Sequence, residues 1–365
     1  MSQLLAGCLN KIFEFLEDDD ITLRACLLVN HFWCEISVKI LWRNVLNYNI
    51  GNFRTLIACL PNKSKEILQK NGIIIPTSTT TPKPPMFNYA SFCKVLSINQ
   101  VNNNIENLLS ISSQNNLNDN IHIMKQEIYK LFMKQISSLK TLNVLGIRNA
   151  NFTNYPGAEN CLKNLSELHC NSYYTCPDFF YQLSQICHDL QILSIKLEGI
   201  ISDGLADLIS VQKNLKWLKL TQYFYCTSIT DIIPSLTKIS NSLIKFDFLY
   251  NLDQYIPLLF ITKFINLQEI ILSFEGTKSF EDFEKLQYFS FSQLQILDIR
   301  HKCPKFEFLI HFLEINGETL KEFYAGERFS VCDHSLNLAV SKFCPNLRKL
   351  SVGFKSDELE TVNHL

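Results

Sequence analysis

The chain has 365 residues, of which 47% are hydrophobic and 19% charged, so it carries enough apolar material for a packed core and is not disordered throughout. Its 34 basic and 35 acidic side chains give a net charge of -1. The chain therefore has no excess of positive charge that would favour binding to a nucleic acid or an anionic membrane. We expect neither a signal peptide nor a membrane span, because no long uncharged apolar run occurs. Thirteen cysteines without an export signal are typical of reduced thiols in a cytoplasmic or nuclear protein.

Three short helices are predicted near the start of the chain. Apolar residues recur at helical spacing from Leu9 to Leu16, and the acidic run that follows ends this helix. Asp20 or Thr22 is expected to cap a second helix, and Asn30 a third. So few short helices cannot bury their apolar faces against one another, because domains of about forty residues are marginal alone. A partner surface is therefore predicted to cover them.

Residues 51–135 are predicted to connect these helices to the rest of the chain. Within this region, the Pro- and Thr-rich stretch 77–85 is expected to be a solvated linker. The Asn-rich stretch 99–120 shows little periodic apolar content, so we expect a mobile insertion there. Residues 93–98 have the apolar offsets of a short strand, which would open the series of repeats described next.

A short leucine-rich pattern then recurs. Nine segments of the form L-x-x-L-x-L, with apolar substitutes, begin at Leu139, Leu165, Leu190, Leu215, Leu243, Leu267, Leu294, Leu320 and Leu347. Their separations, from 24 residues (243 to 267) to 28 residues (215 to 243), lie in the range of leucine-rich repeats. In such repeats each strand points its leucines inward and the chain returns along a helix. The predicted fold class is therefore α/β: over residues 136–365, a horseshoe-shaped solenoid with parallel concave strands and convex helices.

The N-terminal helices and the repeats resemble two known elements. Residues 4–46, with the segments CLNKIFEFL, LRACLLVNHFWCEI and ILWRNV, resemble an F-box, the adaptor-binding helical motif of ubiquitin-ligase substrate receptors. The resemblance departs from the motif at its start, where Ala6-Gly7 stands in place of the usual Leu-Pro. The repeats are similar to the cysteine-containing leucine-rich repeats that follow F-boxes, as in ISDGLADL, SITDIIPSL and FCPNLRKL.

This resemblance implies a substrate-recognition subunit of a Skp, cullin and F-box type E3 ubiquitin ligase. An F-box over residues 1–50 would bind a Skp-type adaptor and through it a cullin, while the repeats would bind a protein substrate. The resemblance implies no catalysis by the chain itself and no cofactor. The adaptor surface and the small core behind it are expected to comprise Leu9, Ile12, Phe13, Leu16, Leu23, Val29 and Trp33. Trp42 is expected to pack at the end of the motif.

Two other hypotheses stay open at this point. The N-terminal helices could instead cap the first repeat, since solenoids need polar caps for solubility. The chain would then be a leucine-rich interaction scaffold that recruits no ligase. A receptor with a small-molecule pocket in the solenoid is a third hypothesis, although no cofactor signature supports it.

No nucleotide-binding, metalloprotease or hydrolase motif occurs, so we expect no enzymatic activity. His301 and Cys303 are close in sequence, but a nucleophile and base also need an orienting group and a cleft. One group of thiols and imidazoles lacks the paired C-x-x-C spacing of a zinc site: Cys161, His169, Cys170, Cys176, Cys187 and His188. Neither catalytic residues nor metal ligands are predicted, and Cys170 is interpreted as a small apolar side chain in the core.

Target binding is expected on the concave face, whose side chains alternate with the inward leucines along each strand. Charges of both signs lie on this face. The candidate target-binding residues are Trp217, Lys219, Lys245, Asp247, Asp298 and Tyr324. Trp217 and Tyr324 are the expected energetic anchors, because aromatic residues dominate binding hot spots.

Overall fold

A computed structural model describes residues 6–73, 85–110, 117–146, 152–173, 177–223, 229–326 and 334–352. The chain divides into two compact units, residues 1–165 and 166–365. The fold is mixed α/β with parallel strands, as predicted. No helix in the described ranges is both long and apolar enough to cross a bilayer. The predicted linker at 77–85 lies outside the described residues, except for Pro85.

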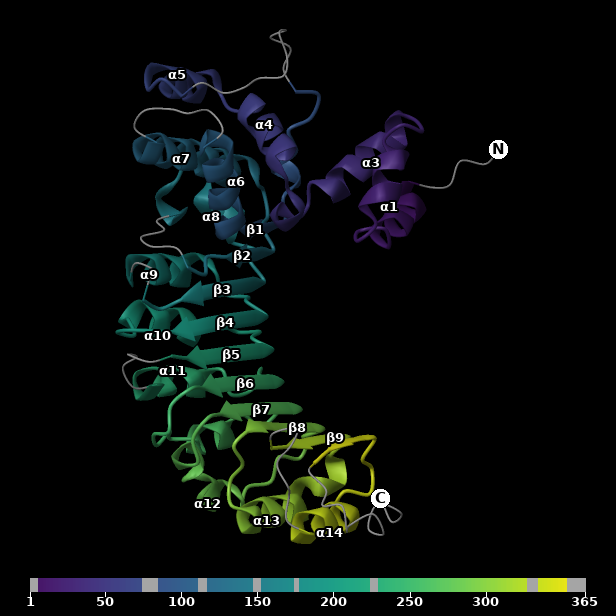
Figure 1. Cartoon of the computed structure of the whole chain (residues 1–365), viewed down its shortest axis with the longest axis vertical. Helices are drawn as coiled ribbons and strands as arrows, with labels where there is room; N and C mark the ends of the chain where they lie inside the picture. Colours follow the sequence, from purple (N-terminus) through teal and green to yellow (C-terminus); the bar gives the residue numbers. More distant parts are fainter. Residues whose placement is uncertain are drawn as a thin grey trace. The chain divides into compact units, whose positions relative to one another are not determined.

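The first unit begins with three short helices: α1 (Ala6–Glu14), α2 (Asp20–Cys26) and α3 (His31–Leu41), drawn in purple in Figure 1. Asn30 caps α3 as predicted, because its side chain accepts the Trp33 N–H at 2.9 Å. The cap of α2 is Asp19, and the prediction of Asp20 or Thr22 is wrong. The Asp19 carboxylate accepts both the hydroxyl and the N–H of Thr22, and these hydrogen bonds lower its pKa.

In its described residues, the rest of the first unit contains two strands, five further α-helices and three short 3₁₀ turns. The elements are η1 (Val45–Asn47), α4 (Ile50–Ala58), α5 (Asn62–Lys70), η2 (Tyr89–Phe92), β1 (Val95–Ser97), α6 (Ile98–Ser110), α7 (Leu117–Gln135), β2 (Thr141–Asn143), η3 (Phe152–Asn154) and α8 (Ala158–Leu162). The strand predicted at 93–98 is therefore present as β1, which pairs in parallel with β2. Trp42 is buried at the end of α3, where its ring contacts those of Tyr48 and Tyr89.

The Asn-rich stretch is largely helical, so the prediction of a mobile insertion over 99–120 is wrong for residues 99–110 and 117–120. In α6, Val101 and Ile105 are fully buried. Asn104 is buried beside them and donates to the Gln100 carbonyl at 2.9 Å. The apolar residues of α6 do keep a helical period, but asparagines separate them and hide it. Residues 111–116 lie outside the described part.

The described residues of the second unit form eight strands, each hydrogen-bonded in parallel to the next along the chain. They are β3 (Glu167–Asn171), β4 (Ile192–Leu197), β5 (Trp217–Gln222), β6 (Lys245–Tyr250), β7 (Glu269–Phe274), β8 (Ile296–His301), β9 (Glu322–Ala325) and β10 (Lys349–Ser351). Every strand begins two residues after a predicted repeat leucine. The second strand residue points into the core in β3 to β9, where it is at most 2% exposed.

Helices connect these strands and lie on one side of them, with α9, α10 and α11 stacked beside β3 to β6 (Figure 1). The connecting elements are α9 (Pro177–Ile186), α10 (Asp203–Ser210), η4 (Ile229–Asp231), α11 (Ile233–Lys238), η5 (Leu259–Lys263), η6 (Lys278–Phe280), α12 (Phe283–Leu286), α13 (Phe306–Asn316), η7 (Gly317–Thr319) and α14 (His334–Phe343). The return between β6 and β7 is a 3₁₀ turn, η5, instead of the helix expected of such repeats, and the rings of Phe246, Phe260 and Phe264 pack together there.

Buried amides join neighbouring repeats. Gln212, 4% exposed, accepts the Leu190 N–H at 2.9 Å and donates to the carbonyls of Cys187 and Leu208 at 2.8 Å. Asn316 makes a similar set of three hydrogen bonds four repeats further along the chain. Each amide satisfies backbone groups that the core would otherwise leave unpaired, so these residues fix how one repeat stacks on the next.

Candidate interaction surfaces

The structure separates the predicted adaptor residues into two groups. Leu9, Phe13 and Leu23 are buried in the small core of the three helices, together with Cys26, Ile36 and Ile40. Leu16 and Trp33 are partly buried against that core, and the Trp33 ring meets the Phe13 ring edge-on, with centroids 5.1 Å apart. These five predicted residues therefore form or cover the internal core of the three helices. Ile12 and Val29 point outward, and about half of each side chain is exposed.

Further large apolar side chains are exposed in the same segment, and the helical period did not reveal them. Phe15 is 92% exposed, Leu28 89% and Ile21 83%, while Phe32 is 39% exposed. Together with Ile12 and Val29, these four residues make six exposed apolar side chains between positions 12 and 32, here called the N-terminal apolar set. Soluble proteins rarely leave so much apolar surface uncovered in one small region. The set is therefore a candidate docking surface.

Ion pairs hold the turn that presents Phe15. Arg43 lies beyond the end of α3, and its guanidinium lies 3.2 Å from a Glu17 carboxylate oxygen and 3.9 Å from one of Glu14. These two glutamates flank Phe15 on either side. The contacts link the turn after α1, which carries Phe15, to the residue that follows the end of α3.

The candidate target-binding residues share one side of the strands in the second unit. Strand register places Trp217 beside Lys245, Lys219 beside Asp247, and Asp298 beside Tyr324. All six occupy the first or third position of their strands, alternating with the buried second position. The structure therefore brings them onto one face, as the alternation predicts.

Most charges on this strand face are neutralised by a neighbour. Lys219 Nζ lies 3.3 Å from an Asp247 carboxylate oxygen, and Lys245 Nζ lies 2.7 Å from one of Glu269. Asp298 accepts from the Arg300 guanidinium at 2.6 Å. Asp247 and Asp298 are only 8% and 9% exposed. A target would therefore meet a face of paired charges, in which these two carboxylates are largely covered.

Tyr324 is similarly engaged within the face. Its hydroxyl donates to Glu322 at 2.7 Å, and Lys349 donates to the other oxygen of the same carboxylate at 2.8 Å. The hydrogen bonds from Lys349 and Tyr324 lower the pKa of Glu322, and the bond to Glu322 raises the pKa of Tyr324. The ring of Tyr324 stays partly exposed, but its hydroxyl already has a partner.

Trp217, at the first position of β5, has a cation over its ring. Lys245 Nζ lies 4.6 Å from the ring centroid while it also pairs with Glu269. The indole is partly buried, and its N–H has no hydrogen-bond partner among the residues that the structure describes. Trp217 therefore offers a fixed, partly exposed apolar surface next to a cation.

Thiols in the described ranges are poor nucleophiles where they are buried. Burial raises the pKa of Cys161 to about 12 and that of Cys344 to about 11, and it raises the pKa of the fully buried Cys170 further. Cys176 of the cysteine and histidine group lies outside the described residues. Among the residues that are described, no three His, Cys, Asp or Glu side chains are placed to hold a metal ion. His301 has a left-handed backbone, with φ of 64°, and its Nδ1 lies 3.7 Å from Glu275.

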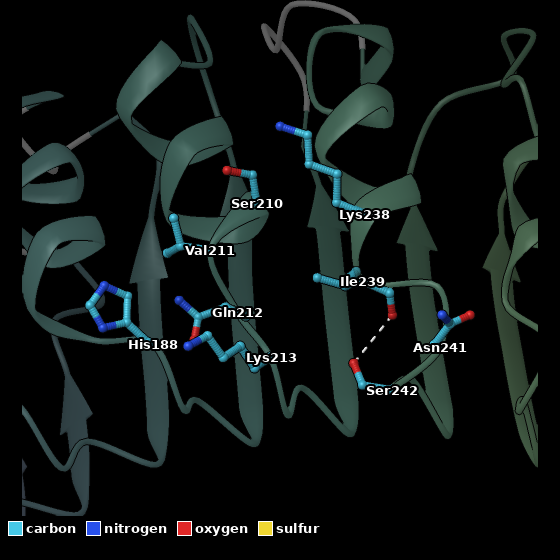
Figure 2. Close-up of a pocket in the computed structure, with 9 residues that line it drawn as sticks. All are labelled: His188, Ser210, Val211, Gln212, Lys213, Lys238, Ile239, Asn241 and Ser242. Carbon is cyan, nitrogen blue, oxygen red and sulfur yellow. Dashed lines mark hydrogen bonds between the residues drawn. The ribbon is translucent and has the colours of Figure 1, made fainter.

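A surface pocket of about 630 Å³ lies between the ends of α10 and α11 (Figure 2). Its lining residues are His188, Ser210, Val211, Gln212, Lys213, Lys238, Ile239, Asn241 and Ser242. Gln212 is committed to the core, and the Ser242 hydroxyl donates to the Ile239 carbonyl. In Figure 2 the remaining polar side chains do not converge on one point, so this pocket has no arrangement suited to chemistry.

No protein-family model matches this chain, and no curated protein matches it in sequence. Its function is therefore proposed from its own residues. Two surfaces carry that proposal: the N-terminal apolar set and the strand face around Trp217.

Proposed function

We propose that this chain is the substrate-recognition subunit of a Skp, cullin and F-box type ubiquitin ligase. Its N-terminal helices would bind a Skp-type adaptor and through it a cullin, and the strand face of the repeats would bind the protein target. The chain would supply binding and positioning, with the chemistry carried out elsewhere in the complex. Cytoplasm or nucleus is the matching location, and thiols such as Cys26, Cys93 and Cys170, which form no disulfide, fit a reducing compartment.

The N-terminal apolar set carries this proposal. The three helices already have a core of their own, built from Leu9, Phe13, Leu23 and neighbouring residues. Phe15, Ile21 and Leu28 contribute little to that core, since each is more than four-fifths exposed. A cap that only sealed the first repeat would have no use for outward apolar side chains, whereas an adaptor interface needs such anchors.

The direct test is assembly. Co-expressed with a Skp-type adaptor, the full chain is expected to co-elute with it as a stoichiometric complex in size-exclusion chromatography, and to bring a cullin into that complex. Expressed without the adaptor and concentrated, it should self-associate through the N-terminal apolar set, whereas dilute solutions stay usable for titration and unfolding. A full chain that stays monodisperse alone and ignores the adaptor would instead support an interaction scaffold that recruits no ligase.

Target capture is assigned to the strand face, and Trp217→Ala tests it. Trp217 is partly exposed and lies at the first, outward position of β5, so its truncation should leave adaptor binding unchanged. The amount of target recovered with the receptor should fall at least about tenfold, since an aromatic hot spot is worth about 2 kcal/mol or more. The measurement is quantitative mass spectrometry of proteins co-purified from extract.

Two controls bracket this prediction. Trp217→Phe keeps a ring beneath the Lys245 cation and should retain most of the capture. Tyr181→Ala removes an exposed aromatic residue from α9, and should have no effect. Equal target recovery by Trp217→Ala and wild type would move the binding site away from β5.

A further inference from the structure

Four side chains of β4 and β5 form a square of hydrogen-bond donors. Strand register pairs Ser194 with Lys219, and Lys196 with Thr221. All four occupy the third or fifth position of their strands, so they share the face that carries Trp217. Two corners are ammonium groups and two are hydroxyls, and no corner is a carboxylate. These four residues are here called the donor square.

Lys196 differs from Lys219 and Lys245 because it forms no ion pair with any residue that the structure describes. Lys219 and Lys245 each lie within 3.3 Å of a carboxylate oxygen. The Lys196 ammonium instead lies 5.9 Å from the centroid of the Tyr223 ring, and the lysine is partly exposed. Glu198 follows just beyond the end of β4, and it does not pair with this ammonium. The positive charge of Lys196 is therefore open to a ligand.

The acid beside the donor square is covered, whereas the cations of the square reach solvent. Lys219 Nζ lies 3.3 Å from an Asp247 carboxylate oxygen, but the lysine side chain is 41% exposed and that of the aspartate only 12%. Ser194 and Lys196 are also partly exposed, and Thr221, 7% exposed, forms the floor of the square. An approaching molecule therefore meets two ammonium groups and a hydroxyl before it meets a carboxylate.

The two lysines of the square are diagonal neighbours. Their Cα atoms lie about 8 Å apart, given the spacing of strands and of residues along them. A carboxylate between Lys196 and Lys219 would reduce the repulsion of these like charges and accept charge-assisted hydrogen bonds from both. The donor square therefore fits a carboxylate supplied from outside the chain.

Trp217 gives this anion site an apolar neighbour. It lies two residues before Lys219 on β5, and four residues before Thr221, the register partner of Lys196. At about 3.3 Å per residue, these offsets amount to about 7 and 13 Å along the strand. An extended segment of a bound protein covers such a distance with two to four residues.

We infer that the target presents an extended segment in which an apolar residue packs on Trp217 and an Asp or Glu, two to four residues away, binds the donor square. The apolar residue follows from the partly exposed indole, the acid from the two accessible ammonium groups, and the separation from the strand geometry. This inference rests on the proposed function, because it names the kind of target that the strand face would capture.

Peptide selection by the full chain tests this inference. A phage library of short random peptides is panned on the immobilised chain, after depletion on the Trp217→Ala variant to remove peptides that bind other surfaces. The recovered peptides are expected to share an apolar residue and an acid two to four positions from it. Binders that share no acid, or a library that yields no binder, would overturn the inference. The selection needs no adaptor, so its failure is a separate result from failure to co-elute with the adaptor.

A double-mutant cycle then tests the contact itself. On the wild type, replacing the shared acid of a selected peptide by its amide should weaken binding about fivefold, the upper range for an ion pair open to solvent. On Lys196→Gln the same replacement should change the affinity by less than about twofold. Lys213→Gln removes an exposed lysine after α10 and should respond like the wild type. Equal losses on the wild type and on Lys196→Gln would show that the acid does not bind the donor square.

Discussion

The double variant Phe15→Ala/Leu28→Ala is expected to lose the Skp-type adaptor and to keep its fold. These side chains are 92% and 89% exposed, so their truncation removes little internal contact. If both are interface anchors, each truncation costs about 2 kcal/mol or more, and adaptor affinity should fall at least a hundredfold. Calorimetric titration of the full chain with adaptor gives the affinity, and thermal unfolding gives the stability.

Two further variants make the expectation specific. Phe13→Ala removes a buried ring that packs against Trp33, which should cost about 3–5 kcal/mol of stability in the N-terminal helices and disturb adaptor binding only through unfolding. Lys39→Ala changes an exposed polar residue of α3 and should alter neither quantity. Wild-type adaptor affinity in the double variant would show that the N-terminal apolar set serves another partner.

Asn316→Leu is expected to destabilise the repeats strongly. The Asn316 side chain accepts the buried Phe291 N–H at 2.7 Å and donates to the Phe289 carbonyl at 2.9 Å, and it is itself 3% exposed. Leucine has nearly the same shape but leaves both backbone groups unpaired. At about 1–3 kcal/mol for each unsatisfied group, the free energy of unfolding should fall by about 2–6 kcal/mol. Urea unfolding followed by circular dichroism measures this loss.

Asn266→Leu is the matched control. Its side chain also links two repeats, by donating to the Asn241 carbonyl at 2.7 Å, but that bond is exposed and water can replace it. The free energy of unfolding should therefore change by no more than about 0.5 kcal/mol. Equal losses in the two variants would mean that burial of the amide does not decide its contribution.

The sequence alone determined the repeats and their strands. Each L-x-x-L-x-L segment fixes which side chains point inward, because side chains alternate along a strand and one face must be buried. Leu218 and Leu297 are buried as this pattern requires, and Trp217 and Asp298 take the other face. The same alternation predicted β1. Helical spacing of apolar residues predicted the three N-terminal helices, and the residue type at position 30 predicted the Asn30 cap.

The tertiary structure decided which apolar residues stay outside and which polar residues go inside. A helical period marks one apolar face, but it does not show whether Phe13 or Phe15 points to the core, since that depends on how α1 packs on α3. Nor does it show that α6 buries Asn104, because burial of an amide requires a partner that lies elsewhere in the chain. Gln222 is a similar case: a glutamine in a strand looks solvated in sequence, and only the neighbouring strands and loops enclose it.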